Sequence, residues 1–337
     1  MRGETVSGRA GTGWRADGRR TKVALWRHHP RRDVSAPALV TATRDLDRRL
    51  EGDLIKLTPA GTWQAAAFGL TDCWRPDPVG LRTILHRPVA AVADWAGIGQ
   101  AAAAAPWHPR EEAVLKATAD MAATRTRPVP LLTTLFAPAT VLAQLAPADV
   151  LARHLAEAPE AVMAALDAVA GRAVRLVAAI AAAGADGVYL AAKHRGHGRW
   201  PLPAGAAGDR LAAAIDDTDR RVMAAADGLG FNMLHLHEAD AAAWWPLPAG
   251  VARWAVHLDQ AVLEALPAQA LAGALPAVGL DHRLIGRGGR DLAAVVDRLR
   301  CGPGAGGMIL ASACVLPLSV DLRAAARMMR QLRRVAT

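Results

Sequence analysis

The feature that most constrains this sequence is the alternation of short apolar runs with longer segments of helical period. Eight runs have the length and composition of buried strands, and each is followed by a segment whose apolar residues recur every three to four positions. Such alternation predicts parallel strands, because a helix must carry the chain back to the start of the next strand. The runs are residues 22–26 (KVALW), 53–57 (DLIKL), 130–136 (PLLTTLF), 187–191 (GVYLA), 231–237 (FNMLHLH), 251–257 (VARWAVH), 276–280 (PAVGL) and 308–313 (MILASA).

Eight strand–helix units predict an α/β fold, a single closed (β/α)8 barrel or TIM barrel. The alternative is a doubly wound open sheet, but no Gly-x-Gly-x-x-Gly turn follows the first run and the phosphate-loop spacing is absent. The same absences predict no nucleotide cofactor. We expect residues 21–337 to form the barrel and the Gly- and Arg-rich residues 1–20 to form a flexible N-terminal tail.

Residues 59–128 are too many for one crossover between the second and third strands. We expect a helical insertion there, packed over the barrel mouth. It contains Trp63, Trp74, Trp95 and Trp107, which predict that it packs as part of the barrel domain. Either a lid or a homodimer contact fits this expectation.

The net charge of +9 is concentrated at the two chain ends. Residues 1–50 hold 12 Lys and Arg against 5 Asp and Glu, and residues 318–337 hold 5 against 1. A nucleic-acid interface requires basic residues on one folded face, with aromatic or amide side chains among them. This distribution instead predicts solvated termini and no nucleic-acid partner.

Three cysteines are too few for a disulfide framework, and we expect no signal peptide before the first strand. The most apolar stretch, residues 173–191, is interrupted by Arg175, Gly184 and Asp186, whereas a membrane span needs about 20 apolar residues. We therefore predict a cytoplasmic protein that does not bind a membrane.

Polar side chains gather where the predicted strands end, which is where a (β/α)8 barrel carries its reacting groups. An active site at this rim would explain them, although strand ends are also where polar residues are tolerated. The residues are Arg27, His28, Lys56, Thr58, Lys193, His194, His235, His237, His257, Asp259, Asp281, His282 and Cys314.

Among these residues, His235 and His237 form the pair that most clearly suggests a metal site. Two residues apart on a strand, they share a face, and Cys314 follows the eighth strand at the same mouth. Two imidazoles and a thiolate suit zinc, which takes three protein ligands and leaves a position open in catalytic sites. A hydrogen-bonded histidine pair beside an inert buried thiol is the alternative.

Cationic residues nearby predict an anionic substrate. Arg27 and His28 have the donors to clamp a carboxylate, unless they belong to a surface cluster with the arginines that follow. Lys56 lies within an apolar run and is either a buried functional cation or a rim residue.

Seven segments together resemble the uroporphyrinogen decarboxylase (URO-D) superfamily, in particular its bacterial decarboxylase-like branch. Each motif is short, and their common order along the chain carries the resemblance. The fold that it implies, a (β/α) barrel, agrees with the strand count. The segments are LWRHHP at 25–30, DLIKLTPAGTW at 53–63, FAPAT at 136–140, AAGADGVYLAA at 182–192, NMLHLHE at 232–238, AVGLDHR at 277–283 and ILASACVLP at 309–317.

True decarboxylases of this superfamily remove acetate carboxyl groups from a tetrapyrrole without metal or cofactor. They carry an Arg-Gln-Ala-Gly-Arg-Tyr segment, an aspartate after the second strand and a histidine near the last. The corresponding positions here hold residues 27–30 (RHHP), residues 56–58 (KLT) and Cys314. Since the aspartate that holds pyrrole N–H groups is missing, the comparison disfavours tetrapyrrole decarboxylation.

Methyltransferases of the superfamily move a methyl group from a corrinoid protein to a thiol such as coenzyme M. Their zinc is held by a His-x-Cys pair and a later Gly-Cys-Gly cysteine. His235 matches the first ligand and Cys314 the last, while His237 replaces the middle cysteine. One thiolate instead of two leaves the metal more positive, which lowers the pKa of a bound thiol further but makes the thiolate less nucleophilic.

The leading hypothesis is an enzyme of one-carbon chemistry in which zinc (Zn2+) activates a thiol or another small nucleophile for methyl transfer. A small anionic substrate and a corrinoid protein are the implied partners. The alternatives are a metal-free decarboxylase of uroporphyrinogen or a smaller carboxylate, and a non-enzymatic corrinoid- or tetrapyrrole-binding protein. The assigned residues are His235, His237 and Cys314 for the metal, Arg27, His28, Lys56 and Lys193 for the substrate, and His257 and Asp281 for acid–base chemistry or ligand orientation.

Overall fold

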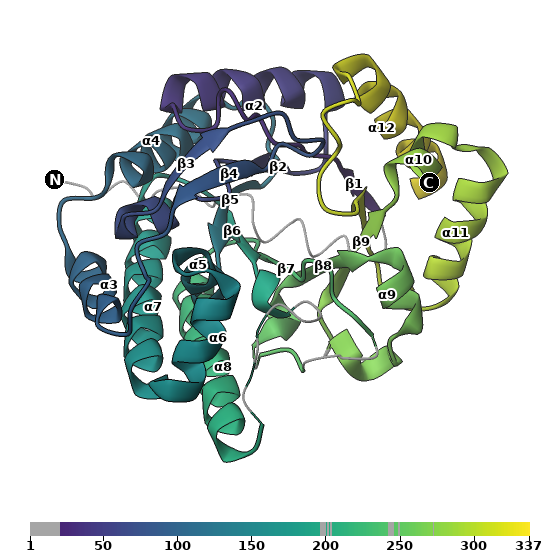
Figure 1. Ribbon diagram of the computed structural model, residues 1–337. Helices are drawn as coiled ribbons and strands as arrows, with labels where there is room; N and C mark the ends of the chain where they lie inside the picture. Colours follow the sequence, from purple (N-terminus) through teal and green to yellow (C-terminus); the bar gives the residue numbers. More distant parts are fainter. Residues whose placement is uncertain are drawn as a thin grey trace, which may run out of the picture.

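A computed structural model of the chain describes residues 21–195, 200, 202, 204–241, 246–248, 250–271 and 273–337; the predicted tail, residues 1–20, lies outside this range. Eight parallel strands form a ring inside a shell of helices (Figure 1). Their hydrogen-bonded order is β1-β10-β9-β8-β7-β6-β5-β2. The strands are β1 Lys22–Ala24, β2 Ile55–Leu57, β5 Leu131–Phe136, β6 Gly187–Ala191, β7 Met233–His235, β8 Ala255–Asp259, β9 Leu275–Leu280 and β10 Ile309–Ser312.

The two ends of this order, β1 and β2, meet and nearly close the barrel. The backbone N–H of Asp53 donates to the carbonyl of Val23 at 2.8 Å. The Asp53 carboxylate in turn accepts from the N–H of Val23 at 2.7 Å, so a side chain completes the pairing that a longer strand would make. The predicted (β/α)8 barrel is therefore confirmed.

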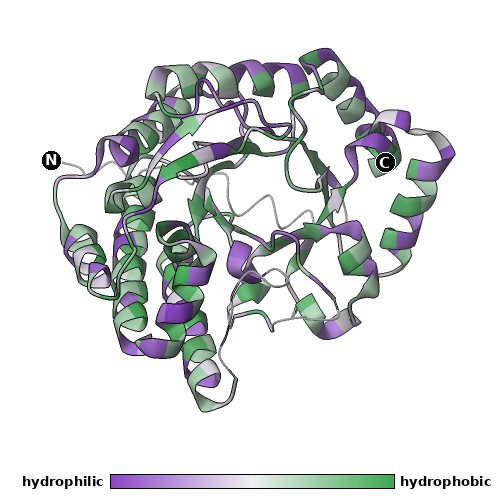
Figure 2. Cartoon of the chain, in the orientation of Figure 1, coloured by the Kyte–Doolittle hydropathy of each residue, from purple (hydrophilic) through white to green (hydrophobic). Residues whose placement is uncertain are grey.

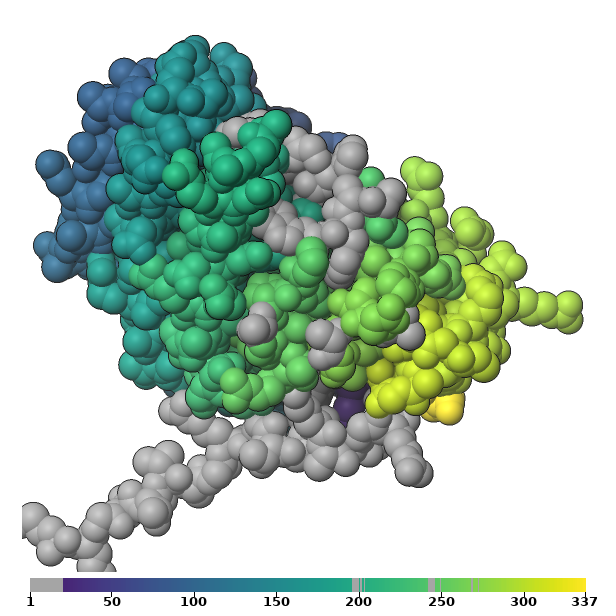
Figure 3. Space-filling view, turned by 90° about the horizontal axis from the view of Figure 1, so that it is seen from below, coloured from purple at the N-terminus to yellow at the C-terminus, as the bar shows by residue number. Residues whose placement is uncertain are grey.

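Helices pack around the ring with their apolar faces inward and their polar faces outward (Figure 2). Seen from below, the described surface passes from teal through green to yellow, so segments from the middle to the end of the chain succeed one another across this side (Figure 3). No helix in the described ranges is both long and apolar enough to cross a membrane. The helices outside the insertion are α2 Ala36–Leu50, α5 Pro138–Leu145, α6 Ala148–Glu157, α7 Pro159–Ala182, α8 Ala206–Ala226, α9 Gln260–Ala265, α10 His282–Arg287, α11 Gly289–Cys301 and α12 Leu322–Ala336.

The strand predicted over residues 251–257 begins later than expected. Gly250 has a φ of 91° and starts a 3-10 turn, Val251–Arg253, so β8 forms only from Ala255 onward. β8 ends at Asp259, so His257 lies within the strand and not at its end.

The insertion between β2 and β5 is not the purely helical segment that we expected. A two-stranded antiparallel hairpin, β3 Thr71–Trp74 and β4 Arg82–His86, lies among its helices α3 Asp94–Ala103 and α4 Pro109–Thr124. The Asp72 carboxylate anchors the hairpin, since it accepts from Arg82 at 2.5 Å and from Arg110 at 2.6 Å. Tertiary ion pairs of this kind are invisible to local periodicity, which explains the wrong prediction.

Gly187 opens β6 at a point where no side chain fits. A methyl group there would overlap the carbonyl oxygen of Phe231, so we expect Gly187→Ala to destabilise the fold by about 3 kcal/mol. Gly171, on α7, has nothing within 4 Å, and Gly171→Ala should instead stabilise by about 0.5–1 kcal/mol. Urea unfolding of both variants checks the pair, and equal midpoints would contradict the close approach.

Candidate functional site

His235 ends β7 and lies buried at the barrel mouth, stacked on His257 of the neighbouring strand with ring centroids 4.6 Å apart. Its Nδ1 lies 3.4 Å from the carbonyl oxygen of His257. Because a carbonyl only accepts, Nδ1 carries the proton and Nε2 keeps a free lone pair. That buried Nε2 has no hydrogen-bond partner within the described ranges. Burial, with His257 nearby, lowers the pKa of His235 well below its usual value, so the ring is neutral and able to bind a metal.

His237 and Cys314 complete the cluster. The Cys314 Sγ lies 3.4 Å from Nδ1 of His237, whose Nε2 is 3.1 Å from the Glu238 carboxylate. Glu238 has a φ of 52°, a conformation that is uncommon outside glycine, and it turns the chain directly after His237. The carboxylate favours a proton on Nε2, which leaves the Nδ1 lone pair facing the thiol.

One donor atom from each of His235, His237 and Cys314 lies within 4.8 Å of the others. The fold thus brings together the three residues that the sequence pairs as metal ligands. Two nitrogens, one sulfur and a vacant lone pair match the preference of zinc. Each histidine also has an acceptor on its other ring nitrogen, as metal-bound histidines almost always do. The residues present therefore fit zinc.

The protonation of Cys314, the third candidate ligand, depends on two opposing effects. Burial raises the pKa of its thiol, and the positive charge of Lys56 acts in the opposite direction. Metal binding requires the thiolate, so a neighbouring cation favours the ligand form.

Lys56 lies in an aromatic cage at the mouth. Its Nζ is 4.2 Å from the ring centroid of Tyr189 and 5.6 Å from that of Trp26. Burial lowers the pKa of Lys56 to about 7. The sequence interpretation missed Tyr189 and Trp26, although one signal was available: Tyr189 is the only tyrosine of the chain and lies within a predicted strand.

His257 stacks on His235 of the candidate metal site. Its Nε2 is 3.0 Å from the carbonyl oxygen of Ser312, so Nε2 donates and Nδ1 accepts from the Tyr189 hydroxyl at 2.9 Å. Burial lowers the pKa of His257 to about 3. With both nitrogens engaged, His257 orients its neighbours: its carbonyl fixes His235 and its ring holds Tyr189.

The substrate residues predicted from the sequence separate into two places. Burial, together with the positive charges of Lys56 and Lys193, lowers the pKa of His28 to about 3, so these three lie near one another at the mouth. Arg27 points elsewhere, because its guanidinium donates to the carbonyls of Val320 at 2.7 Å and Leu318 at 3.2 Å.

Asp281 is not one of the three residues of the candidate metal site. It caps α10, where its carboxylate accepts from the N–H of Arg283 at 2.6 Å. It lines a cavity of about 320 Å³ together with Asp259 and Ser312. Burial and the charge of Glu238 raise the pKa of Asp259 to about 6, closer to neutral pH, where a carboxyl group can exchange a proton.

Comparison with known proteins relates the chain to one known family. Residues 35–199 match the family model of uroporphyrinogen decarboxylase (URO-D). No match was found among curated proteins.

Two solved structures share the fold. A methyltransferase from Methanosarcina mazei superposes with a TM-score of 0.70 at 12% identity, over 97% of this chain and 99% of that one. A putative vitamin-B12-independent methionine synthase from Listeria monocytogenes gives 0.51 at 10% identity, over 89% and 86%. At such identities the likeness concerns the fold alone.

Proposed function

Because the chain belongs to the uroporphyrinogen decarboxylase superfamily, we propose that it is a zinc-assisted methyltransferase that acts on a thiol or another small nucleophile. The observation that carries the proposal is the buried, unpartnered Nε2 of His235 beside the His237–Cys314 pair. Leaving such a buried acceptor unsatisfied costs about 1–3 kcal/mol, which a bound metal would recover.

In this proposal His235, His237 and Cys314 hold the zinc. Bound there, zinc would lower the pKa of a coordinated thiol and present it as the thiolate nucleophile. The His257 carbonyl and the Glu238 carboxylate keep the two imidazoles in the tautomers that ligation requires.

The substrate's anionic group binds beside this centre. Lys56 and Lys193 supply positive charge, and the neutral His28 supplies a hydrogen-bonding ring nitrogen. The aromatic walls of Trp26 and Tyr189 exclude water around Lys56, which strengthens its attraction for the anion. Asp259, and Asp281 further out, serve acid–base roles in the proposal.

A corrinoid protein is the methyl donor in this proposal, as the resemblance implies. The M. mazei structure of the same fold is described as a methyltransferase, which supports the reaction class. We place the enzyme in the cytoplasm as a monomer or homodimer, with no nucleic acid or membrane as partner.

Elemental analysis of protein purified without chelators tests the proposal. We expect about one zinc per chain and transfer of a methyl group from methylcobalamin to 2-mercaptoethanesulfonate. Chelation should abolish the transfer and added zinc should restore it. The absence of stoichiometric metal would remove the basis of the proposal.

A metal-free decarboxylase is the second candidate, and the position of Lys56 supports it. A buried cation against two aromatic rings would stabilise the carbanion left when carbon dioxide departs. Carbon dioxide release from a candidate acid that persists in the presence of chelator would favour this reaction over methyl transfer.

A further inference from the structure

Cys314, the third candidate metal ligand, lies just beyond the part of its chain segment that the barrel sheet holds. β10 pairs with β9 as far as Ser312, and the N–H of Ala313 still donates to the carbonyl of Leu280 at 3.0 Å. Cys314 follows in the loop that leads to α12. The position of its Sγ therefore depends on contacts outside the strand ladder.

Trp26, which follows β1, makes two such contacts. Its indole Nε1–H donates to the carbonyl oxygen of Cys314 at 2.6 Å. Its own carbonyl oxygen accepts from the N–H of Leu316 at 2.9 Å. One residue of the first strand segment is thus bonded to the Cys314 loop on both sides of Val315.

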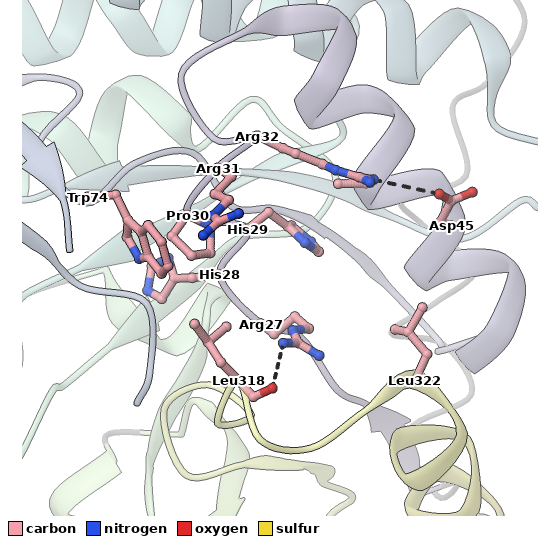
Figure 4. Close-up of a pocket in the computed structure, with 11 residues that line it drawn as sticks. Arg27, His28, His29, Pro30, Arg31, Arg32, Asp45, Trp74, Leu318 and Leu322 are labelled. Atoms are coloured by element: carbon pink, nitrogen blue, oxygen red, sulfur yellow. Dashed lines mark hydrogen bonds and ion pairs between the residues drawn. The ribbon is translucent and has the colours of Figure 1, made fainter. Parts of the chain in front are cut away.

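Arg27, the next residue, bonds to the same loop further along. Its guanidinium donates to the carbonyls of Leu318 at 3.2 Å and Val320 at 2.7 Å. Figure 4 shows the Arg27 side chain directed toward Leu318, between the segment after β1 and the loop before α12. These bonds restrain the far part of the loop, whereas the Trp26 indole is the group that reaches Cys314 itself.

The Trp26 indole is also packed against the residues that surround the other ligands. Its ring meets the ring of His257 edge-on, with centroids 5.1 Å apart, and that of Tyr189 at 5.6 Å. His257 in turn stacks on His235. Because Trp26 is buried and these rings confine it, its N–H is held in the direction of the Cys314 carbonyl.

We propose that Trp26 is a positioning residue for the candidate metal site, an inference that rests on the proposed function. Its indole N–H holds the backbone of Cys314, so that Sγ stays beside His237 before a metal binds. A ligand that is already in place loses less conformational freedom on binding than a mobile one. Residues that orient metal ligands typically contribute about 10–100-fold to metal affinity.

Trp26→Phe separates this role from simple packing. Phenylalanine keeps an aromatic ring toward Lys56 and His257, and the backbone bond to Leu316 does not need the indole, so the change removes chiefly the Nε1–H donor. Trp254→Phe is the matched control. Trp254 is equally buried, precedes β8 at the end of the barrel opposite the mouth, and has an Nε1 without a hydrogen-bond partner in the described part of the chain.

Two measurements compare these variants. Competition with a chromogenic chelator should show zinc binding about 10–100-fold weaker in Trp26→Phe and unchanged in Trp254→Phe. Iodoacetamide labelling of the metal-free protein, followed by mass spectrometry, reports on the loop without any metal. Cys314 should be labelled about tenfold faster in Trp26→Phe, because one hydrogen bond no longer holds the loop. The exposed Cys301 should react at the same rate in all proteins.

Equal zinc affinities and equal Cys314 labelling rates in the two variants would overturn the inference. A lower urea midpoint for Trp26→Phe with unchanged Cys314 labelling would also overturn it, since Trp26 would then only pack. The outcome can be distinguished from that of the proposed function. If the wild type bound no zinc, the proposed function would fail, while faster labelling of Cys314 in Trp26→Phe alone would still support the positioning of its thiol.

Discussion

Cys314→Ser is expected to reduce zinc affinity by more than about 100-fold and to abolish methyl transfer. Serine keeps the size of the side chain but replaces a soft thiolate by a hydroxyl, which is a poor zinc ligand at neutral pH. Loss even of a residue that only orients a metal ligand typically costs about 10–100-fold, so loss of a ligand should cost more. Elemental analysis and the methylcobalamin assay measure the two effects.

Cys301→Ser is the matched control. Cys301 ends α11 and is exposed, so its replacement should leave both zinc content and activity unchanged. Unfolding midpoints add a readout that separates metal loss from misfolding. Added zinc should raise the midpoint of the wild type, since it binds only the folded chain, and should not raise that of Cys314→Ser. Full zinc occupancy in Cys314→Ser would exclude the thiolate as a ligand.

Arg172→Met should lower the free energy of unfolding by about 3–5 kcal/mol, because it leaves the buried carboxylate of Glu111 without its charged partner. Arg172 donates to both carboxylate oxygens of Glu111, at 2.8 and 2.5 Å, and both side chains are almost fully buried. The same guanidinium also donates to three carbonyls, those of Ala101, Ala102 and Ala104. This cluster ties α3 and α4 of the insertion to α7.

Urea unfolding measures the effect, with Arg221→Met as control. Arg221 pairs with Asp167 across exposed surface, where both side chains are well solvated, and its loss should cost less than about 1 kcal/mol. The double variant Arg172→Met, Glu111→Gln should recover part of the loss, since it removes the unpaired carboxylate. If Arg172→Met and Arg221→Met lowered the free energy of unfolding equally, the buried Arg172–Glu111 pair would not be what anchors the insertion.

The strands were predictable because parallel strands in a barrel are buried on both faces. Residues 187–191 are a continuous apolar run and form β6, and residues 130–136, which are apolar apart from Thr133 and Thr134, contain the whole of β5. The hairpin was not predictable in this way. Its position depends on Asp72, which pairs with Arg110 from a helix 38 residues away, and no local pattern reports such a contact.

The candidate site, too, was predictable from the sequence only in part. His235 and His237 were paired by strand alternation, and Cys314 by its place after the last strand. The tautomers that make His235 and His237 usable ligands depend on the His257 carbonyl and the Glu238 carboxylate. The roles of Tyr189 and Trp26 depend on their contact with Lys56, which lies on a different strand.

The sequence by itself determined the eight strand–helix units, the barrel and the three residues that approach one another at its mouth. Each follows from backbone geometry, in which side-chain direction repeats every two residues in a strand and every 3.6 residues in a helix. Neighbouring residues in the sequence are enough to recognise these two periods. Only the tertiary structure decided which way Arg27 points, which nitrogen of His235 is left free and how the insertion folds. Those outcomes depend on hydrogen bonds and ion pairs between segments far apart in the chain, and such contacts exist only once the barrel has closed.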